Sequence, residues 1–568
     1  MKRPEKSFGN KNTIDKKTIL AWLMSGLFGV LSGVFLVFGY QLETADSINI
    51  SDSNAMMIML TIMIIITIDT RYVWRGYDAQ RQGAKLFGIL RTNVVNEVEG
   101  SEAAAPSAPT KADFLLTWAV LNLLNLPVLL AEFPGFFVYD AQDELNEVLT
   151  RSFSTHHPLL HVLLLGGTIA LVHKITGSWN LGIFTYIVFQ MLAITAIFAY
   201  TLMYLQKRGV GRNNRILWTA CYGLFPTIVM YTLCSSKDGL FSALLLLLVV
   251  LLCELTDDPA SFIEQRIKPI SLVLTAFLMP CFRHNGFYAY LVFVPFGLWY
   301  LYKHVEGKKL FGRLAAALVI PVVCYLVFNS VLSAAFSSEV THHQEMLTVP
   351  IMQMARVYKY DRDSLSQEDI DTLTAFIPEK NLELYTGRVS DLVKVDFDND
   401  YYEGHKGEFF GLWFKLFKQH PMVYVNAWLL TSYGYCYPPA NINVYKGTSM
   451  FTFTYDTSSY FGYEVEQPGE RHSFIPIIDK LYRYLSIGTF HDDAPVLYLF
   501  FSPGLMLLIY MFVLFYRLYH GDFKGIIPFL PVVLTFLTVL LGPTYLVRYV
   551  VYLWMCLPVL LCNRRIRW

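Results

Sequence analysis

The chain has 568 residues, of which 54% are hydrophobic and only 16% are charged, and its formal net charge is zero. Without an overall basic excess, nothing in the charge balance indicates a nucleic-acid partner. Apolar runs such as residues 239–255 are long enough to cross a hydrocarbon core as helices, which disfavours a soluble multi-domain enzyme.

Hydropathy predicts an all-α polytopic membrane protein with about 12 transmembrane helices. The predicted spans cover residues 18–41, 54–73, 113–133, 180–205, 214–234, 239–256, 269–283, 286–302, 310–331, 495–516, 525–542 and 546–562. Basic residues recur in every second connection, whereas the loop at 43–54 has none, so both termini are predicted to be cytoplasmic in a cell (plasma) membrane. The first span is long for a signal peptide, and we interpret it as a retained anchor.

The apolar stretch 158–173 has only 16 residues and a central Gly-Gly pair. If it crossed the membrane, the basic turn that follows would lie outside and every later loop would invert. We therefore predict a short helix in the outer interface, within a first outside loop at 134–179.

The chain divides into four predicted regions. They are an N-terminal two-helix hairpin with a cytoplasmic linker (1–112), a membrane core (113–331), an extracytoplasmic region (332–494) and C-terminal membrane helices (495–568). In the extracytoplasmic region, residues 364–385 have a helical pattern, whereas 451–465 alternate like a strand or form an aromatic loop. A mixed α/β cap is therefore expected outside the membrane.

The first outside loop begins with FPGFFVYDAQDEL, where acidic residues crowd beside the third span. One helix face carries Asp140, Asp143, Glu144 and Glu147. The last three fit the solvated face of an interfacial helix. Asp140 lies at the hydrocarbon edge, where a carboxylate is expected to have a raised pKa and to act as a base. Asp140 is therefore the first candidate for a catalytic base, with Asp143 and Glu144 as alternatives.

Further along, THHPLLH opens the predicted interfacial helix. His156 and His157 precede Pro158, and two imidazoles beside the N–H groups of a helix N-terminus form an anion site. The alternative interpretation is that the segment only caps the helix. His161 lies one turn beyond His157 and is a candidate for the same cluster. A divalent cation is a further alternative, since imidazole and carboxylate are common ligands.

Three short outside turns place a cation directly at a helix end. They are SSKDG with Lys237, FRHNG with Arg283, His284 and Asn285, and GPTYLVRYV with Arg548. A lone cation at the interface usually serves as a snorkelling anchor. Because the positive-inside pattern discourages cations on the outer side, three of them together favour a cavity for a phosphate near the outer leaflet.

The outside region also contains SYGYCYPPANINVY, whose aromatic rings and amides suit stacking on a sugar. Tyr435 is the candidate for substrate binding in this stretch, alongside His161, His284 and Asn285. The same composition is ordinary for an interfacial cap. Gly-rich phosphate loops, nucleophile elbows and zincin motifs are absent, which disfavours an ATP-driven pump and hydrolases of those classes.

An acidic residue just after an early membrane helix, followed by an interfacial helix opened by a His-Pro element, resembles the GT-C superfamily of multi-pass glycosyltransferases. This superfamily includes protein O-mannosyltransferases and lipid A aminoarabinose transferases. A longer series looks like an uncharacterised family of bacterial multi-pass proteins related to these enzymes. It comprises FPGFFVYDAQDEL, HHPLLHVLLLG, SSKDGLFSALLLL, CFRHNGFYAYL, MLTVPIMQMARVY, HPMVYVNAWLLTSYGYCYP and GPTYLVRYVVYL. A shifted Asp-Glu pair and a single proline in place of His-Pro-Pro leave the base open between Asp140, Asp143 and Glu144.

The resemblance implies a GT-C-like enzyme that transfers a sugar from a polyprenyl-phosphate donor to a glycan, lipid or protein acceptor outside the membrane. The donor phosphate would be held by His156, His157, Lys237, Arg283 and Arg548. Asp140 would remove the acceptor proton while the cations stabilise the leaving phosphate, so this scheme needs no metal. Membrane lipids are the other expected partner.

Two further classes of function stay open. A lipid or polysaccharide transporter (flippase) explains outer cations in a large apolar body, but it would more naturally place ionisable groups in mid-membrane. A non-catalytic envelope scaffold leaves Asp140 and the outer cations without a common purpose. The glycosyltransferase hypothesis predicts that Asp140, Lys237, Arg283 and Arg548 converge on one cavity.

Overall fold

The computed structural model describes residues 16–81, 108–336, 343–440, 465–487 and 489–562. The longer helices are α1 (Lys16–Ala45), α2 (Ser53–Arg81), α3 (Lys111–Ala131), α5 (Leu159–Thr176), α6 (Trp179–Lys207), α9 (Lys237–Asp257), α12 (His284–His304), α13 (Lys308–Phe336), α18 (Asn399–Gln419) and α23 (Pro503–Tyr519).

The shorter α-helices are α4 (Ala141–Thr150), α7 (Arg212–Leu224), α8 (Pro226–Thr232), α10 (Pro259–Glu264), α11 (Ile267–Leu278), α14 (Thr348–Tyr360), α15 (Gln367–Phe376), α16 (Glu379–Glu383), α17 (Asp391–Lys394), α19 (Pro421–Leu430), α20 (Pro476–Ile487), α21 (Phe490–Asp493), α22 (Pro495–Tyr498), α24 (Phe523–Ile526), α25 (Leu530–Val539) and α26 (Tyr552–Cys562). The 3-10 helices are η1 (Met279–Cys281), η2 (His343–Glu345), η3 (Arg362–Ser364), η4 (Tyr433–Tyr435), η5 (Leu499–Phe501), η6 (Ile527–Phe529) and η7 (Val547–Val550). Within the described ranges there is no β-strand, only two isolated bridges.

Seven of the described helices are long and apolar enough to cross a membrane, so the chain is an α-helical membrane protein. They are α1, α2, α3, α5, α6, α9 and α13. An eighth span would join α22 and η5 to α23 across a bend of 66°. The described helices therefore do not support the predicted count of about 12 spans. Prolines explain part of the difference, because the predicted span 214–234 breaks before Pro226 and the predicted span 495–516 bends at Pro503.

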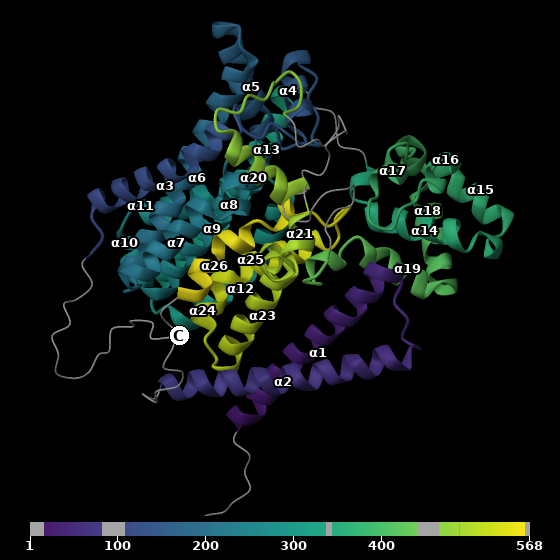
Figure 1. Cartoon of the computed structure of the whole chain (residues 1–568), viewed down its shortest axis with the longest axis horizontal. Coiled ribbons are helices and arrows are strands. Elements are labelled where there is room, and N and C mark those ends of the chain that lie inside the picture. Colours follow the sequence, from purple (N-terminus) through teal and green to yellow (C-terminus); the bar gives the residue numbers. More distant parts are fainter. Residues whose placement is uncertain (1–15, 82–107, 337–342, 441–464, 488, 563–568) are drawn as a thin grey trace, which may run out of the picture.

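Helix α5 covers the stretch that was predicted to lie in the outer interface. Its 18 residues pass the same length and hydropathy test as the other six helices. In Figure 1, however, α5 stands at the top of the main body and runs across the direction of α2. Its interfacial position therefore stays a prediction.

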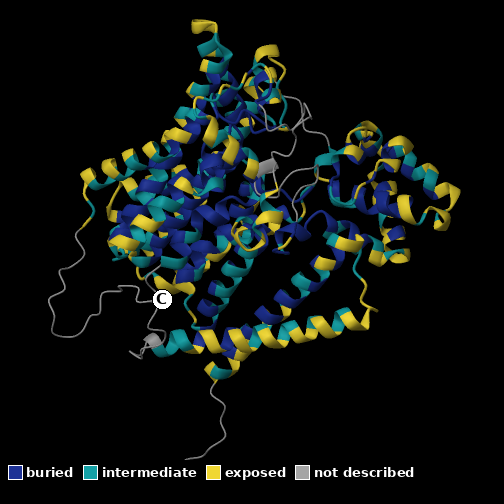
Figure 2. Ribbon diagram, in the orientation of Figure 1, coloured by how far each residue is buried: buried dark blue, intermediate teal, exposed yellow. Residues whose placement is uncertain are grey.

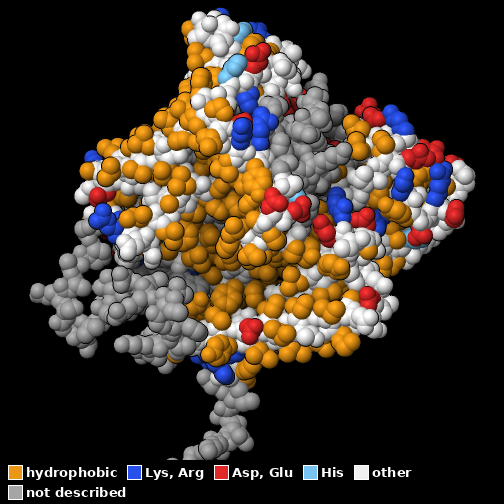
Figure 3. Space-filling model, viewed as in Figure 1, with side chains coloured by type: hydrophobic (Ala, Val, Ile, Leu, Met, Phe, Trp, Pro, Cys, Tyr) orange, Lys and Arg blue, Asp and Glu red, His pale blue; other side chains and the backbone are white. Residues whose placement is uncertain are grey.

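The region predicted to be extracytoplasmic contains a helical cap with a hydrophobic core of its own, which extends from Leu347 to Tyr424. The expected mixed α/β cap is wrong for the described residues, because apolar residues there follow helical spacing and pack α14, α15 and α18 together. Nearly all of the predicted strand at 451–465 lies outside the described residues. Charged side chains gather on this cap in Figure 3, whereas hydrophobic ones cover much of the main body.

The cap is attached to the loop between α1 and α2. Arg356 donates through Nη2 to the Asp46 carbonyl oxygen (2.7 Å). Arg388 donates to the Leu42 and Glu43 carbonyl oxygens at 3.3 and 3.2 Å and forms an ion pair with Asp46 at 3.1 Å. Because this loop joins two membrane helices at their predicted outer ends, these contacts fix where the cap meets the membrane body.

The N-terminal hairpin packs on the C-terminal helix α23. Trp74 of α2 is fully buried and its ring lies against Phe512, Tyr516 and Tyr519. Most of α2 is otherwise exposed (Figure 2). The first and last predicted regions of the chain are therefore neighbours in space.

Candidate functional site

A short parallel bridge brings the predicted first outside loop against the turn before α9. The Phe136 N–H donates to the Leu233 carbonyl oxygen (3.0 Å), and the Ser235 N–H donates to the Phe136 carbonyl oxygen (2.9 Å). Tyr139 then turns the chain with a φ of +65°, which a non-glycine residue seldom adopts. Asp140 follows at the N-terminus of α4, and Lys237 is the first residue of α9.

Lys237 joins three predicted site residues. Its Nζ lies 2.8 Å from Oδ2 of Asp140, 2.8 Å from Nδ1 of His157 and 3.5 Å from Oε1 of Glu144. An ammonium group has three N–H donors, so these acceptors match its full capacity. Since Nδ1 of His157 accepts from the ammonium, the ring proton of the neutral imidazole is assigned to Nε2.

The two arginines share a second buried carboxylate, Asp238. Arg548 lies 3.0 Å through Nη2 from Oδ2 of Asp140 and 3.3 Å through Nε from Oδ2 of Asp238. Arg283 donates through Nη1 to Oδ1 of Asp238. The ring of Tyr549 contacts both guanidinium groups, at 4.5 Å from Arg283 and 5.1 Å from Arg548. These contacts hold the two guanidinium groups together beside Asp238, and Arg548 also beside Asp140.

Glu144 leads from this cluster into a buried hydrogen-bonded chain. Its Oε2 pairs with Nδ1 of His161, and Nε2 of His161 lies 2.8 Å from the Tyr186 hydroxyl. That hydroxyl donates to Oε1 of Gln190 (3.2 Å), whose amide donates to backbone carbonyl oxygens of the turn before α9. The chain links α4, α5 and α6 to the segment that carries Lys237.

The acid-base state of Asp140 differs from the sequence-based expectation. Burial raises the pKa of Asp140, but the neighbouring charges of Arg548 and Lys237 outweigh burial and hold it well below the usual range. The predicted raised pKa is therefore wrong for this state of the protein. Glu144 is also not part of a solvated face: it is buried, and despite that burial the charges of His161 and Lys237 lower its pKa to about 2.

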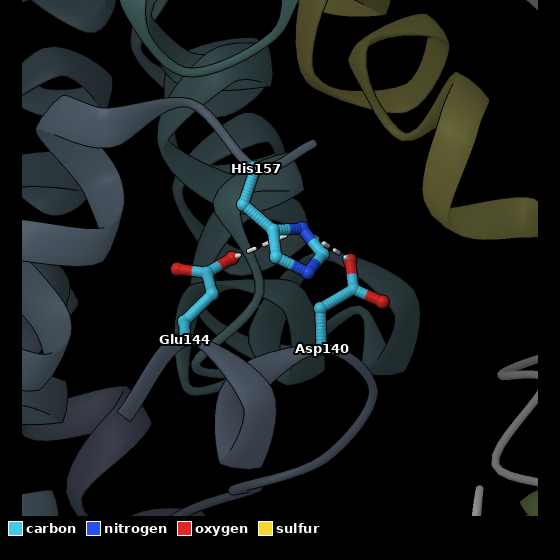
Figure 4. A group of neighbouring side chains, drawn as sticks. All are labelled: Asp140, Glu144 and His157. Carbon is cyan, nitrogen blue, oxygen red and sulfur yellow. Dashed lines mark ion pairs between the residues drawn. The ribbon is translucent and has the colours of Figure 1, made fainter. Parts of the chain in front are cut away.

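His157 is neutral at physiological pH. Burial and the Lys237 ammonium lower its pKa to about 3, although Asp140 and Glu144 raise it. Its ring lies between the carboxylates of Asp140 and Glu144, with Nδ1 at 3.9 Å from each (Figure 4). His157 therefore offers a polar N–H to an anion rather than a full positive charge.

Eight of the predicted site residues line one cavity of about 550 Å³. They are Asp140, His156, His157, Lys237, Arg283, His284, Asn285 and Arg548. Asn285 donates to the Thr538 hydroxyl (3.0 Å), and Nδ1 of His284 lies 3.1 Å from the Tyr325 hydroxyl. Residues from turns more than 400 positions apart thus meet at one place, as Asp140 and Arg548 do.

The other four predicted residues lie elsewhere. Glu144 and His161 are buried outside the lining; Glu144 contacts Lys237 and pairs with His161. Asp143 is exposed on α4 and lies outside the lining. Tyr435 is fully buried; its hydroxyl donates to the Thr544 carbonyl oxygen (3.2 Å) and accepts from the Leu546 N–H (3.0 Å). Tyr435 therefore supports the loop before Arg548 and does not reach the cavity.

Several residues of the site had no signal in the sequence. Glu345, Asp391 and Lys394 enter the lining from the cap, where nothing in their local pattern distinguishes them from solvated charges. Glu466 is buried next to Asp140; burial and the Asp140 charge raise its pKa to about 9, although the backbone N–H groups of Gln142 and Tyr139 lower it. Its isolated position after an aromatic stretch gave no reason to select it.

The donor set also resembles a metal site. Asp140, Glu144 and His157 offer ligand atoms that all lie within 4.8 Å of one another. In the described structure these three side chains instead share the Lys237 ammonium, whose Nζ lies within 3.5 Å of all three. A cation bound by this set would have to displace Lys237, because the two charges would occupy the same space.

A family model described as a family of unknown function, DUF6020, matches residues 147–564, which is more than half of the chain. No curated protein and no solved structure matches the chain. The matched range contains Lys237, Arg283 and Arg548, whereas Asp140 and Glu144 precede it.

Proposed function

The chain belongs to the DUF6020 family, and we propose that it acts as a GT-C-like membrane glycosyltransferase. It transfers a sugar from a polyprenyl-phosphate donor to a hydroxyl group of an envelope glycan, lipid or protein. In this proposal the protein lies in the plasma membrane with both termini in the cytoplasm, and the cavity opens on the outer side.

One observation supports this proposal above the others. A carboxylate and three cations, contributed by four separate turns, line a single cavity whose volume of about 550 Å³ suits a sugar phosphate. Cations bind and stabilise phosphate, and a carboxylate beside them is placed to take a proton. The three cations are Lys237, Arg283 and Arg548.

The charges of the site are balanced before any substrate binds. The three cations are paired with three carboxylates, namely Asp140, Glu144 and Asp238. A donor phosphate must therefore replace one of these carboxylates. Asp140 is the accessible one, since its side chain is 24% exposed, compared with 2% for Glu144 and 0% for Asp238.

This exchange of partners activates the base. When Lys237 and Arg548 turn from Asp140 to the phosphate, the two charges that hold the pKa of Asp140 low are neutralised. Burial then dominates, and the pKa of Asp140 rises. A carboxylate that is too weak a base in the charge-balanced state becomes competent once the donor is bound.

The reaction follows from this arrangement. The acceptor oxygen forms a bond to the anomeric carbon, the bond from that carbon to the phosphate oxygen breaks, and the acceptor proton passes to Asp140. The donor phosphodiester carries one negative charge and the leaving polyprenyl phosphate carries two. Lys237 and Arg548 stabilise the additional charge.

Purified protein in lipid nanodiscs, supplied with a radiolabelled polyprenyl-phosphate sugar and a membrane extract as acceptor, tests the proposal. We expect release of polyprenyl phosphate and loss of that release in Asp140→Asn. The matched control is Asp143→Asn, because Asp143 lies on the same helix but is exposed and outside the cavity lining. Its activity should equal that of the wild type.

Two results would contradict the proposal. If the wild type binds the donor and moves it between leaflets without consuming it, the protein is a transporter. If Asp140→Asn and Asp143→Asn retain equal activity, Asp140 is not the base. Folding of each variant is checked by its thermal unfolding in the same nanodiscs.

A further inference from the structure

The cavity has a second wall, which the cap contributes. Its lining residues are Gln344, Glu345, Asp391, Lys394 and Val395, from η2, α17 and the residue that follows α17. The cap has its own hydrophobic core and is attached to the loop between α1 and α2. Two separately packed parts of the molecule therefore enclose the same space.

A buried lysine organises this cap wall. Nζ of Lys394 lies 2.6 Å from Oε2 of Glu345 and 3.2 Å from Oδ1 of Asp391. The Lys394 side chain is only 8% exposed, whereas those of Glu345 and Asp391 are 32% and 47% exposed. The Lys394 ammonium is thus enclosed by the cap, and the more exposed carboxylates of Glu345 and Asp391 face the cavity.

The two walls differ in charge. Two carboxylates and one ammonium give the cap wall a net charge of minus one. On the opposite wall, Asp140, Glu144 and Asp238 balance the three cations until a ligand replaces Asp140. A phosphate is repelled by the first wall and attracted to the second. Carboxylates accept charge-assisted hydrogen bonds from hydroxyl groups, and each has about four lone-pair sites.

We propose that the cap wall formed by Glu345, Asp391 and Lys394 binds the hydroxyl groups of a carbohydrate while the opposite wall binds the phosphate. The inference rests on the proposed glycosyl transfer, because it assigns the sugar-binding part of the same cavity. The bound sugar belongs either to the donor or to the acceptor, and both share this chemistry. Lys394 acts as a positioning residue that fixes the two carboxylates.

The most direct test compares Asp391→Asn with Asp396→Asn. Both aspartates belong to the cap and pair with a lysine, at 3.2 Å to Lys394 and 2.8 Å to Lys380. Their side chains are 47% and 45% exposed, but only Asp391 lines the cavity. The two variants thus remove comparable carboxylates from different surfaces.

The probes are neutral methyl glycosides, methyl glucuronide and farnesyl phosphate, with binding measured by ligand-observed NMR on the full chain in nanodiscs. We expect Asp391→Asn to weaken binding of neutral glycosides about 10-fold, the loss of one hydrogen bond to a charged group. Asp396→Asn should leave it unchanged. The wild type should bind the anionic glucuronide more weakly than the neutral sugars. Farnesyl phosphate should bind Asp391→Asn at least as tightly as Asp396→Asn, because the loss of the Asp391 charge lowers the repulsion from the cap wall, and it should lose affinity in Lys237→Met.

Each remaining outcome has one meaning. The inference is overturned if the two variants bind glycosides equally, or if the wild type binds no glycoside. Binding of farnesyl phosphate then still tests the wall that carries the three cations. If the wild type binds neither probe and consumes no donor, the proposed function fails. If Asp391→Asn raises the KM for hydrolysis of the donor by water, the bound sugar is that of the donor. If this KM is unchanged and glycosides compete less well with the acceptor in the transfer reaction, the bound sugar is that of the acceptor.

Discussion

At Lys237, a single ammonium group satisfies Asp140, Glu144 and His157 together. Such a cation is held in place even though it lies at the end of an apolar helix, because its three acceptors offset the loss of hydration. The same saturation means that no ligand reaches Lys237 without displacing one of the three. A ligand therefore binds Lys237 only by taking the place of one of its present hydrogen-bond acceptors.

This exchange predicts opposite effects of one substitution on binding and on turnover. Asp140→Asn removes the carboxylate that competes with phosphate for Lys237 and Arg548. We expect the variant to bind farnesyl phosphate at least about 10-fold more tightly, consistent with about 1.4 kcal/mol or more of charge-assisted hydrogen bonding. Titration calorimetry in nanodiscs measures this. Weaker binding by the variant would show that Asp140 does not compete with the ligand.

Glu466 predicts a pH dependence of stability. Its folded-state pKa is raised to about 9, first by burial and then by the Asp140 charge. Between the unfolded pKa of about 4.3 and the folded-state pKa, Glu466 is protonated in the folded protein and ionised in the unfolded chain. Its contribution to the free energy of unfolding is therefore fully present below the unfolded pKa and is lost as pH rises through the folded-state pKa. The slope approaches about 1.4 kcal/mol per pH unit.

Glu466→Gln removes this titration and keeps the size of the side chain. The stability difference between variant and wild type should therefore grow in favour of the variant as pH rises from 6 to 9. Thermal unfolding midpoints across that range test the expectation. Parallel curves for the two proteins would mean that Glu466 is ionised in the folded protein.

At the scale of elements, a glycine determines how closely α4 approaches α5. A Cβ at Gly166 would lie 2.6 Å from Cγ2 of Val148 and 3.0 Å from the Glu144 carbonyl oxygen. The neighbouring Gly167 has nothing within 4 Å of the same position. The close contact at Gly166 places Glu144 against His161. It therefore also positions the buried hydrogen-bonded chain that continues from His161 to Tyr186 and Gln190.

Gly166→Ala should therefore push α4 outward, at a cost of about 1–3 kcal/mol for overpacking. Sugar transfer should fall as well, because Glu144 carries one of the contacts to Lys237. Gly167→Ala is the control, and helix propensity predicts a gain of about 0.5–1 kcal/mol there. Thermal unfolding and transfer assays on both variants decide the matter; equal behaviour would refute the role of the close contact.

At the scale of the whole molecule, the cavity exists only if the cap stays attached to the membrane body. Arg388 binds the last turn of α1 through the Leu42 and Glu43 carbonyl oxygens, and it binds the loop that follows through Asp46. A cap that loosened there would move its own wall of the cavity away from Asp140. The predicted extracytoplasmic region thus acts as part of the site.

Arg388→Met should loosen that attachment without unfolding the cap core. We expect faster hydrogen exchange at residues 42–49 and weaker glycoside binding, with the exchange inside α14 and α18 unchanged. Arg362→Met is the control, since Arg362 pairs with Glu379 within the cap (2.7 Å). Uniformly faster exchange throughout the cap would instead indicate general destabilisation.

The sequence by itself determined the membrane-embedded helical class, because long apolar runs have few alternatives in a bilayer. It also selected most of the site, since ionisable groups next to hydrocarbon are costly unless they have a function or a partner. Asp140, His157, Lys237, Arg283 and Arg548 were all identified in this way. The described helices do not support the predicted number of spans, in part because hydropathy does not register where proline breaks a helix.

Only the tertiary structure decided how these groups interact. The pKa of Asp140 depends on Arg548, a residue of the C-terminal helices, and hydropathy contains no information on that distance. Glu144 is buried rather than solvated because Gly166 admits α4 against α5. Tyr435 supports a loop instead of a sugar, and Asp391 and Lys394 reach the cavity from the cap. Charges act through space, so their partners are fixed by the fold rather than by their neighbours in the chain.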